Sequence, residues 1–360
     1  MRYKLSELFD LQMGKTPSRN NSEYWNTTDN KWISIGDLSR CDKYITETKE
    51  YLSNKAVSES GISQIPANTV VMSFKLSIGK TAITTEPIYS NEAIMSFRDK
   101  GLVEIIPDYI YYLFTQKDWD NGSNKAVMGK TLNKATLSDV CIDIHPFEKQ
   151  KLIVEILDKV SLIVSLYKQE LDKLDEIIKA RFVEMFGDVV SNTKNWKTYT
   201  WNDVLVIKNG KNQKSVENNE GIYPICGSGG IMSYADDYIT ESNSVIIGRK
   251  GNINNPILMR EKFWNVDTAF GLEPNTTILN VDYLFMFCSF FDFEVLNKAV
   301  TIPSLTKADL LKIIIPIPPI ELQNQFATFV KQIDKSKVAV QKALDEAQLL
   351  FDSLMQQYFG

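Results

Sequence analysis

The stretch Pro146-Phe-Glu-Lys-Gln150 opens a long run of periodic apolar residues, and a near copy, Pro319-Ile-Glu-Leu-Gln323, opens another 173 residues later. At the same shift, Asn124-Lys-Ala-Val127 falls on Asn297-Lys-Ala-Val300, and both copies end on the same Phe-Gly dipeptide. A collinear series of matches indicates an internal repeat. Because the period is far too long for a solenoid unit, the sequence predicts two similar domains, each followed by a helix.

Each of the two periodic runs covers about 40 residues, or roughly 60 Å of helix. The apolar positions alternate steps of three and four, which is the pattern of a coiled-coil seam. Lys337 is the one polar residue in the second seam. The predicted pairing residues are Ile153, Leu157, Val160, Val164, Leu171, Leu174 and Ile178 in the first run, and Phe326, Val330, Ile333, Val340, Leu344 and Phe351 in the second.

Both helix starts carry favourable end residues. The prolines of the two motifs suit the first helical position, and Glu148 and Glu321 lie where the positive end of the helix dipole favours a carboxylate. A long helix with a single apolar stripe needs a partner in water. Because a globular segment separates the two copies, we expect an antiparallel pair. The alternative is that each helix is a core helix of its own domain.

The globular segments mix strand and helix signals. Runs such as 31–35 and 69–74 alternate or are apolar between turn residues and predict strands, whereas 108–114 predicts a helix capped by Asp108. The predicted fold class is therefore α+β, with two similar domains separated by two long antiparallel helices that form a coiled coil in a pseudo-two-fold internal repeat. The predicted boundaries are 1–146, 147–187, 188–319 and 320–360.

Composition fits a globular protein with two cores: of 360 residues, 44% are hydrophobic and 24% are charged. No apolar segment is long enough to span a membrane, and the first residues lack the apolar stretch of a signal peptide, so we expect a cytoplasmic protein. The cysteines Cys41, Cys141, Cys226 and Cys288 show no paired spacing, and His145 is the single histidine. The sequence therefore predicts buried free thiols and no metal site.

Sequence patterns give no support for catalysis. Gly-Lys-Thr occurs at 14–16, 79–81 and 129–131, but none of these triplets has the further glycine that a phosphate-binding loop requires. No serine elbow, histidine dyad or adenine-methylating Asn-Pro-Pro-Tyr motif is present. The clear acids shared by the two copies, such as Asp108 and Asp282, fall at predicted helix starts. We therefore predict no catalytic residue and no bound cofactor.

A basic residue follows a predicted strand in both copies. Lys75 aligns with Lys250, beside small residues that would let backbone amides approach a phosphate, and Arg249 could bind a guanine edge in bidentate fashion. A single basic turn is usually only a solvated loop, but its recurrence favours contact with DNA. The other candidate DNA-binding residues are Lys15, Arg19, Lys80, Lys125, Lys130, Lys211, Lys214 and Lys298.

Net charge departs from the pattern of a nucleic-acid-binding protein. The chain carries a formal charge of −5, and neither globular segment alone is basic. We therefore expect the basic groups to gather on one face, and partner subunits to supply much of the phosphate neutralisation that sets affinity.

The doubled order of domain, Pro-x-Glu-x-Gln turn and long helix resembles the specificity subunit of bacterial type I restriction-modification systems. The phrases Glu155-Ile-Leu-Asp-Lys-Val160 and Lys179-Ala-Arg-Phe-Val-Glu-Met-Phe-Gly187 look typical of the helices of that family. The residues that carry the doubled motif are Pro146, Glu148, Gln150, Pro319, Glu321 and Gln323.

The resemblance implies a function. In that family each domain is a target recognition domain for one half of a split, asymmetric site in double-stranded DNA, and the helices fix the gap between the halves. Two modification subunits that bind S-adenosylmethionine and methylate adenine dock on the subunit, and restriction subunits complete the nuclease. The resemblance places S-adenosylmethionine, ATP and magnesium on those partners only, and it implies no catalytic site in this chain.

Two other interpretations belong to different classes of protein. In the first, the chain is a non-catalytic coiled-coil scaffold whose paired domains bind peptide or carbohydrate. In the second, it is a stand-alone tandem enzyme, which the lack of matched reactive side chains disfavours.

Overall fold

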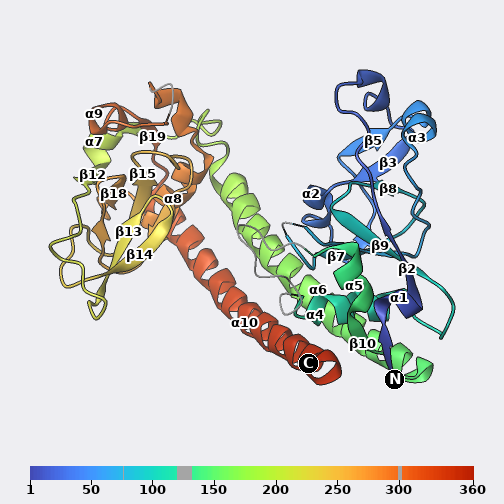
Figure 1. The fold of residues 1–360 in the computed structure, drawn as a ribbon. Coiled ribbons are helices and arrows are strands. Elements are labelled where there is room, and N and C mark those ends of the chain that lie inside the picture. The colour runs from blue at the N-terminus through green and yellow to red at the C-terminus, as the bar shows by residue number, and fades with distance from the viewer. Residues whose placement is uncertain (76, 120–131, 299–301) are drawn as a thin grey trace. The chain divides into compact units, whose positions relative to one another are not determined.

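The computed structural model describes residues 1–75, 77–119, 132–298 and 302–360 (Figure 1). The chain divides into two compact units. Unit 1 contains Met1–Leu166 and Leu344–Gly360, and unit 2 contains Tyr167–Ala343. Each long helix contributes one part to each unit, whereas the predicted segments kept each helix whole. Among the described residues, no helix combines the length and the apolar character that crossing a membrane requires.

The two long helices are α6 (Phe147–Phe186) and α10 (Ile320–Phe359). Each begins one residue after the proline of its motif. The carbonyl of Pro146 accepts hydrogen bonds from the amides of Lys149 and Gln150 at 2.9 and 3.0 Å, and the carbonyl of Pro319 has the same role at the start of α10. The prolines therefore lie at the helix boundary, one position earlier than the sequence suggested.

Domain 1 is built on a five-stranded sheet in the order β2 (Phe9–Met13), β9 (Ile94–Asp99), β6 (Val70–Ser73), β7 (Thr81–Thr84) and β4 (Tyr44–Ile45). A second sheet has the order β5 (Glu50–Leu52), β3 (Asn30–Ile33) and β8 (Tyr89–Ser90), and β1 (Arg2–Lys4) pairs with β10 (Cys141–Asp143). The helices are α1 (Leu5–Leu8), α2 (Ile35–Leu38), α3 (Asn54–Ser60), α4 (Pro107–Gln116) and α5 (Lys134–Asp139), with a 3-10 turn at Ser22–Tyr24.

Domain 2 is built on a four-stranded sheet in the order β12 (Leu205–Asn209), β18 (Ala269–Pro274), β15 (Ser244–Gly248) and β16 (Ile257–Met259). Its second sheet has the order β14 (Gly230–Ala235), β13 (Tyr223–Gly227) and β17 (Trp264–Asn265), and β11 (Thr198–Thr200) pairs with β19 (Ile314–Pro316). The helices are α7 (Trp201–Val204), α8 (Val281–Phe290) and α9 (Lys307–Leu310), with a 3-10 turn at Phe293–Leu296.

The two domains share one topology. Four antiparallel strands follow the same order, each smaller sheet contains one parallel pair, β3 with β8 and β13 with β17, and each two-stranded ribbon joins the first strand to the last. This match confirms the predicted internal repeat and the mixed helix and strand content. Domain 1 adds β4 and the helices α2 and α3, which have no counterpart in the described part of domain 2.

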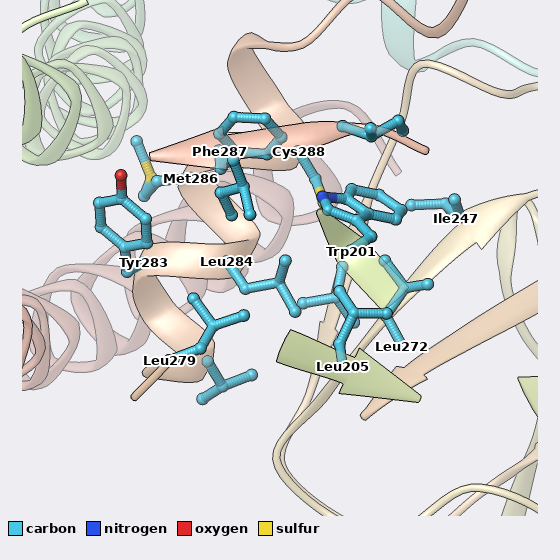
Figure 2. Close-up of a cluster of buried hydrophobic side chains, with 14 of the residues drawn as sticks. Trp201, Leu205, Ile247, Leu272, Leu279, Tyr283, Leu284, Met286, Phe287 and Cys288 are labelled. Carbon is cyan, nitrogen blue, oxygen red and sulfur yellow. The ribbon is translucent and has the colours of Figure 1, made fainter. Parts of the chain in front are cut away.

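The larger core of unit 2 lies between α8 and its sheet. Figure 2 shows Leu284 and Phe287 of α8 packed against Trp201, Leu205 and Leu272, all of which are buried. Burial of aromatic and aliphatic side chains of this size supplies the main driving force for folding. The position of α8 on the sheet is therefore fixed by packing.

Parts of the long helices pack against each other within each unit. In unit 2, the ring centroids of Phe182 and Phe326 are 5.3 Å apart, and the Lys337 ammonium pairs with the Asp175 carboxylate, so the two helical segments run antiparallel. In unit 1, Met355 shares a core cluster with Ile153 and Leu157. Of the predicted pairing residues, Ile153, Leu157, Val160, Val164, Ile178, Phe326 and Val330 are buried, and Leu171, Leu174, Ile333, Val340, Leu344 and Phe351 are half-buried.

A fully buried glutamine ties each long helix to its domain. Gln150 donates from Nε2 to the carbonyls of Glu104 and His145 at 3.0 and 2.9 Å, and its Oε1 accepts from the Ile106 amide at 3.0 Å. Gln323 makes the same three bonds. It donates to the carbonyls of Ile278 and Pro318 at 3.0 and 2.8 Å, and it accepts from the Asn280 amide at 2.8 Å. These bonds explain why the repeated motif contains glutamine.

Two expectations from the sequence need correction. Asp108 does not cap its helix, because α4 begins at Pro107 after Ile106, and the Asp108 carboxylate instead pairs with the Lys43 ammonium. The four cysteines are free as predicted, but only Cys226 and Cys288 are buried. The other two thiols are half-buried.

Replacing Gln323 by alanine should lower the free energy of unfolding by about 3 kcal/mol, because three buried backbone groups lose their partner. Urea unfolding of the purified chain measures this change. The matched control is Gln325→Ala, an exposed glutamine in the same helical turn, which should change stability by less than about 0.5 kcal/mol. A loss below about 1 kcal/mol for Gln323→Ala would contradict the proposed role of this side chain.

Candidate nucleic-acid interface

Three loops meet at one edge of domain 1, and we call residues 14–19, 74–75 and 91–93 the domain 1 loop edge. Backbone hydrogen bonds hold these loops together. The Lys15 amide donates to the Ser90 carbonyl at 2.8 Å, and the Phe74 amide donates to the Ala93 carbonyl at 3.0 Å. The loops therefore form one connected surface.

Domain 2 repeats this arrangement with residues 210–214, 249–252 and 266–268, which we call the domain 2 loop edge. The Lys211 amide donates to the Asn265 carbonyl at 3.0 Å, and the Arg249 amide donates to the Thr268 carbonyl at 2.7 Å. These bonds make Lys15 equivalent to Lys211. They also make Lys75 equivalent to Lys250, as the alignment of the two copies suggested.

A glycine before each matched lysine allows the close approach. A Cβ atom on Gly14 would overlap the carbonyls of Ser90 and Asn91, and one on Gly210 would overlap the carbonyl of Val266. Only a residue without a side chain fits at these two positions. The same short approach therefore fixes the backbone of the lysine that follows in each domain.

A tryptophan holds the carbonyl of each matched lysine. Trp32 Nε1 donates to the Lys15 carbonyl at 3.1 Å, and Trp264 Nε1 donates to the Lys211 carbonyl at 3.0 Å. The two indoles come from different strands of the small sheet, β3 in one domain and β17 in the other. The same bond is therefore kept by different residues, while both lysine side chains remain exposed.

In domain 2 the predicted cations are largely free. Lys211, Lys214 and Lys250 are exposed, and their ammonium groups make no hydrogen bond or ion pair with other described residues. The Arg249 guanidinium makes a long hydrogen bond, 3.4 Å, to the Asp267 carbonyl and lies 5.8 Å from the centre of the Phe270 ring. These four side chains can therefore reach a phosphate or a base edge without breaking a strong internal contact.

In domain 1, by contrast, several predicted cations have internal partners. Lys15 Nζ donates to the Ser60 carbonyl, and Lys80 Nζ donates to Ser39 Oγ at 2.6 Å. The ammonium of Lys75 lies 5.3 Å from the centre of its neighbouring ring, Phe74. Contact with DNA would require the first two lysines to exchange these partners.

Arg19 has a structural environment that its sequence position did not reveal. Its guanidinium stacks 3.7 Å above the ring of Trp25 and lies 4.8 Å from that of Trp32, and it pairs with both carboxylate oxygens of Glu50. A guanidinium held by an aromatic face and a bidentate carboxylate is a strongly ordered group. The geometry therefore assigns Arg19 to the packing of domain 1.

Of three further candidates, one has an internal partner and two lie outside the described residues. Lys298 pairs with Asp309 at 2.9 Å, and the bond to Lys298 is the largest cause of the lowered pKa of that carboxylate. Lys125 and Lys130 belong to residues 120–131, which lie outside the described part of the chain.

Each loop edge also contains a matched carboxylate that sequence comparison missed. Glu92 lies two residues before β9 and Asp267 lies two residues before β18, and both are exposed. A hydrogen bond from Thr16 lowers the pKa of Glu92, and the charges of Lys75 and Arg19 add to the effect against a smaller contribution from burial. Such a carboxylate can accept a hydrogen bond from the amino group of cytosine.

The Glu92 and Asp267 pair escaped detection because its spacing exceeds the repeat period by two residues. Aligning the two copies on β9 and β18, strands that the sequence analysis did not predict, brings the two acids into register. Each loop edge therefore combines several cations with one exposed acid.

The acids that the two copies share at helix starts have structural roles. Burial would raise the pKa of Asp108, but hydrogen bonds from Lys43 and Tyr44 outweigh it and hold the pKa below its usual value. Asp282 is buried and pairs with Arg260 at 2.5 Å. Each ion pair holds the first turn of its helix against the sheet of its domain. Among the described residues, neither pair contacts a loop edge.

The single histidine is also engaged in packing. His145 Nδ1 lies 2.8 Å from the Tyr109 hydroxyl, and burial lowers the pKa of the imidazole, with the nearby Lys149 charge adding to the effect. Within the described residues, no three His, Cys, Asp or Glu side chains are grouped as metal ligands.

Comparison with known proteins identifies the family. The family model of the type I restriction modification DNA specificity domain matches residues 1–176 and again residues 193–347, and the chain therefore belongs to this family. The double match agrees with the internal repeat. The chain is a specificity subunit, and specificity subunits of type I restriction systems are non-catalytic.

Individual relatives support this assignment along the whole chain. The type I restriction enzyme MjaIX specificity subunit of Methanocaldococcus jannaschii is 23% identical, over 98% of this chain and 90% of the relative. The type I restriction enzyme EcoprrI specificity subunit of Escherichia coli is 24% identical, over 92% of this chain and 86% of the relative.

Solved structures share the fold. The crystal structure of the S subunit of a type I restriction-modification system from M. genitalium superposes with a TM-score of 0.61 at 13% identity, over 100% of this chain and 96% of that one. A chain from a study of complex assembly and conformational transition of the type I R-M system gives the same TM-score at 16% identity, over 100% and 97%.

The loop edge of domain 2 generates a prediction about two neighbouring side chains. Lys250→Ala should weaken binding to all duplexes alike and reduce the slope of log affinity against log salt by about 1, because an exposed lysine contacts phosphate. Arg249→Ala should cost about 1–3 kcal/mol and relax preference at one position of one half-site. Competition binding with the assembled complex at several salt concentrations measures both effects.

The control for these variants is Lys197→Ala. Lys197 is exposed and lies 4.9 Å from the Tyr199 ring beside β11, outside the loop edge. Its removal should leave affinity and sequence preference unchanged. Equal effects of Lys197→Ala and Lys250→Ala would show that the domain 2 loop edge is not the DNA-binding surface.

Proposed function

We propose that this chain reads a bipartite, asymmetric site in double-stranded DNA, one half with each domain, and that it positions adenine methyltransferase and restriction subunits on that site. The observation that carries the proposal is the pair of loop edges, which share a hydrogen-bonded framework and differ in the side chains it presents. Membership of the specificity subunit family supports sequence-specific DNA recognition.

The differences between the loop edges favour two unlike half-sites. Phe74 occupies the position of Arg249, and Lys211, which is free in domain 2, corresponds to Lys15, which is internally bonded in domain 1. Bases are distinguished by the donors, acceptors and apolar groups that meet their edges. Two surfaces with different groups on one framework are suited to two different short sequences.

The two long helices suit the role of a spacer, and we propose that they pair as an antiparallel coiled coil along their length. Two of their features support this: each helix places its predicted seam in the core of a unit, and within each unit the segments of α6 and α10 lie against each other. A helix of 40 residues spans about 60 Å, which covers one to two turns of duplex. Helix length would then set the gap between the half-sites.

The partners in this proposal are two modification subunits and, in the complete enzyme, restriction subunits. In the part of α6 that belongs to unit 1, four apolar side chains are 44–58% exposed: Leu152, Leu162, Ile163 and Leu166. An apolar patch of this kind on a long helix suits a partner protein. S-adenosylmethionine, ATP and magnesium would be bound by these subunits.

The net charge of −5 also favours action within a complex, because affinity for DNA depends on the number of phosphates neutralised. Under this proposal the partner subunits supply part of the basic surface. The competing interpretation, a scaffold for peptide or carbohydrate, predicts no duplex preference with or without partners.

Selection from a pool of random duplexes tests the proposal. The chain assembled with its modification subunits should enrich duplexes that carry two short motifs separated by a fixed gap, and the chain alone should enrich the same motifs more weakly. Modification subunits without this chain are the control and should enrich no motif. Enrichment of one continuous motif, or of none, would contradict the proposal.

A further inference from the structure

The β13–β14 hairpin places two exposed apolar side chains at the domain 2 loop edge. The strands pair Gly227 with Gly230 and Cys226 with Ile231, but Ile225 pairs with Ser233, so Met232 is the extra residue of a β-bulge. Bulges re-aim side chains and are frequent next to functional sites. The Ile231 and Met232 side chains are 54% and 64% exposed.

Contacts of neighbouring glycines locate this tip between two cationic loops. A Cβ atom on Gly227 would lie 3.0 Å from the sulfur of Met232 and 3.5 Å from Val266, whose carbonyl lies against the glycine that precedes Lys211. On the other side, a Cβ atom on Gly248 would lie 3.1 Å from Ser228, and Gly248 precedes the loop of Arg249 and Lys250. The hairpin turn therefore lies next to the loops that carry Lys211 and Lys250.

Exposure of one apolar side chain carries no information, since it is common on protein surfaces. Here two adjacent residues are exposed, a bulge re-aims one of them, and the adjoining loops carry lysines whose ammonium groups have no partner among the described residues. The turn itself, Ser228-Gly229-Gly230, offers one hydroxyl and otherwise only backbone. The surface is thus apolar at the hairpin, with lysines in two adjoining loops and the single acid Asp267 in the third.

We propose that this hairpin enters the major groove of the second half-site and that Ile231 and Met232 contact the methyl group of thymine. The inference rests on the proposed function and adds the base that the surface recognises. The major groove admits a two-stranded β-ribbon, and an apolar side chain against the thymine methyl is one of its direct modes of recognition. Lys211 and Lys250 then reach phosphates on either side of the groove.

The charge pattern selects DNA over an apolar protein as the occupant. An apolar protein partner would leave Lys211, Lys214 and Lys250 without counter-charges, whereas a duplex supplies phosphates at both margins. Domain 1 has no equivalent tip, because its strand β3 pairs with β5 across a long connection that contains α2 and β4. The inference therefore concerns one half-site only.

Single replacement of thymine by deoxyuridine tests the inference, because it removes only the methyl group. The probe is a duplex selected by the wild-type complex, with each thymine of the second half-site replaced in turn. The wild-type complex should lose about fourfold in affinity at one or two of these positions, the value expected for one buried methyl group. Replacing thymines of the first half-site should cause no loss of affinity that depends on Ile231 or Met232.

Protein variants complete a double-mutant cycle. Met232→Ala and Ile231→Ala should each weaken binding of the thymine duplex by about four- to tenfold, and at least one of them should abolish the further loss caused by deoxyuridine. Both side chains are exposed, so the variants should fold, which circular dichroism checks. Val206→Ala, 55% exposed on β12, is the matched control and should behave as the wild type.

The results separate this inference from the function on which it rests. If Lys250→Ala weakens binding but both hairpin variants keep wild-type affinity and the wild-type response to deoxyuridine, thymine recognition by the hairpin is wrong and DNA recognition by the domain stands. A second half-site that contains no thymine on either strand would overturn the inference in the same way. Failure of the complex to select any duplex would overturn both.

Discussion

The structure depends on one buried side chain in each copy, Gln150 in the first and Gln323 in the second. Each makes two hydrogen bonds to backbone groups of the turn before α4 or α8 and a third to a carbonyl just before its own long helix, and a buried backbone group without a partner is costly. These bonds fix the start of a long helix to the domain that precedes it. Under the proposed function such a fixed joint is needed, since a flexible one would make the distance between the half-sites variable.

A second constraint acts at the two loop edges. Equivalent backbone hydrogen bonds hold three loops together in both domains, and Gly14 and Gly210 permit the close approach that these bonds need. Because the framework is made by backbone atoms, the side chains on it are free to differ. Trp32 and Trp264 illustrate this freedom, since they supply the same bond to a lysine carbonyl from different strands.

The sequence predicted those features that periodicity and repetition carry: the internal repeat, the two long helices and most of their buried seam, and the equivalence of Lys75 and Lys250. It did not predict contacts between residues far apart in the chain. Arg19 was a candidate DNA-binding residue, but in the structure its guanidinium stacks on Trp25 and pairs with Glu50. Asp108 was predicted to cap its helix, but its carboxylate pairs with Lys43. Motif position alone gave no sign that the glutamine carried the structural role.

The most direct test of two independent half-site readers is an exchange of one domain. Residues 188–319 would be replaced by the matching segment of a family member with a different known site, and methylated adenines would be mapped by sequencing the DNA of cells that express the hybrid with its modification subunits. The account predicts that one half of the recognised site changes while the other half is retained. A hybrid that methylates actively but changes both halves, or neither, would contradict it.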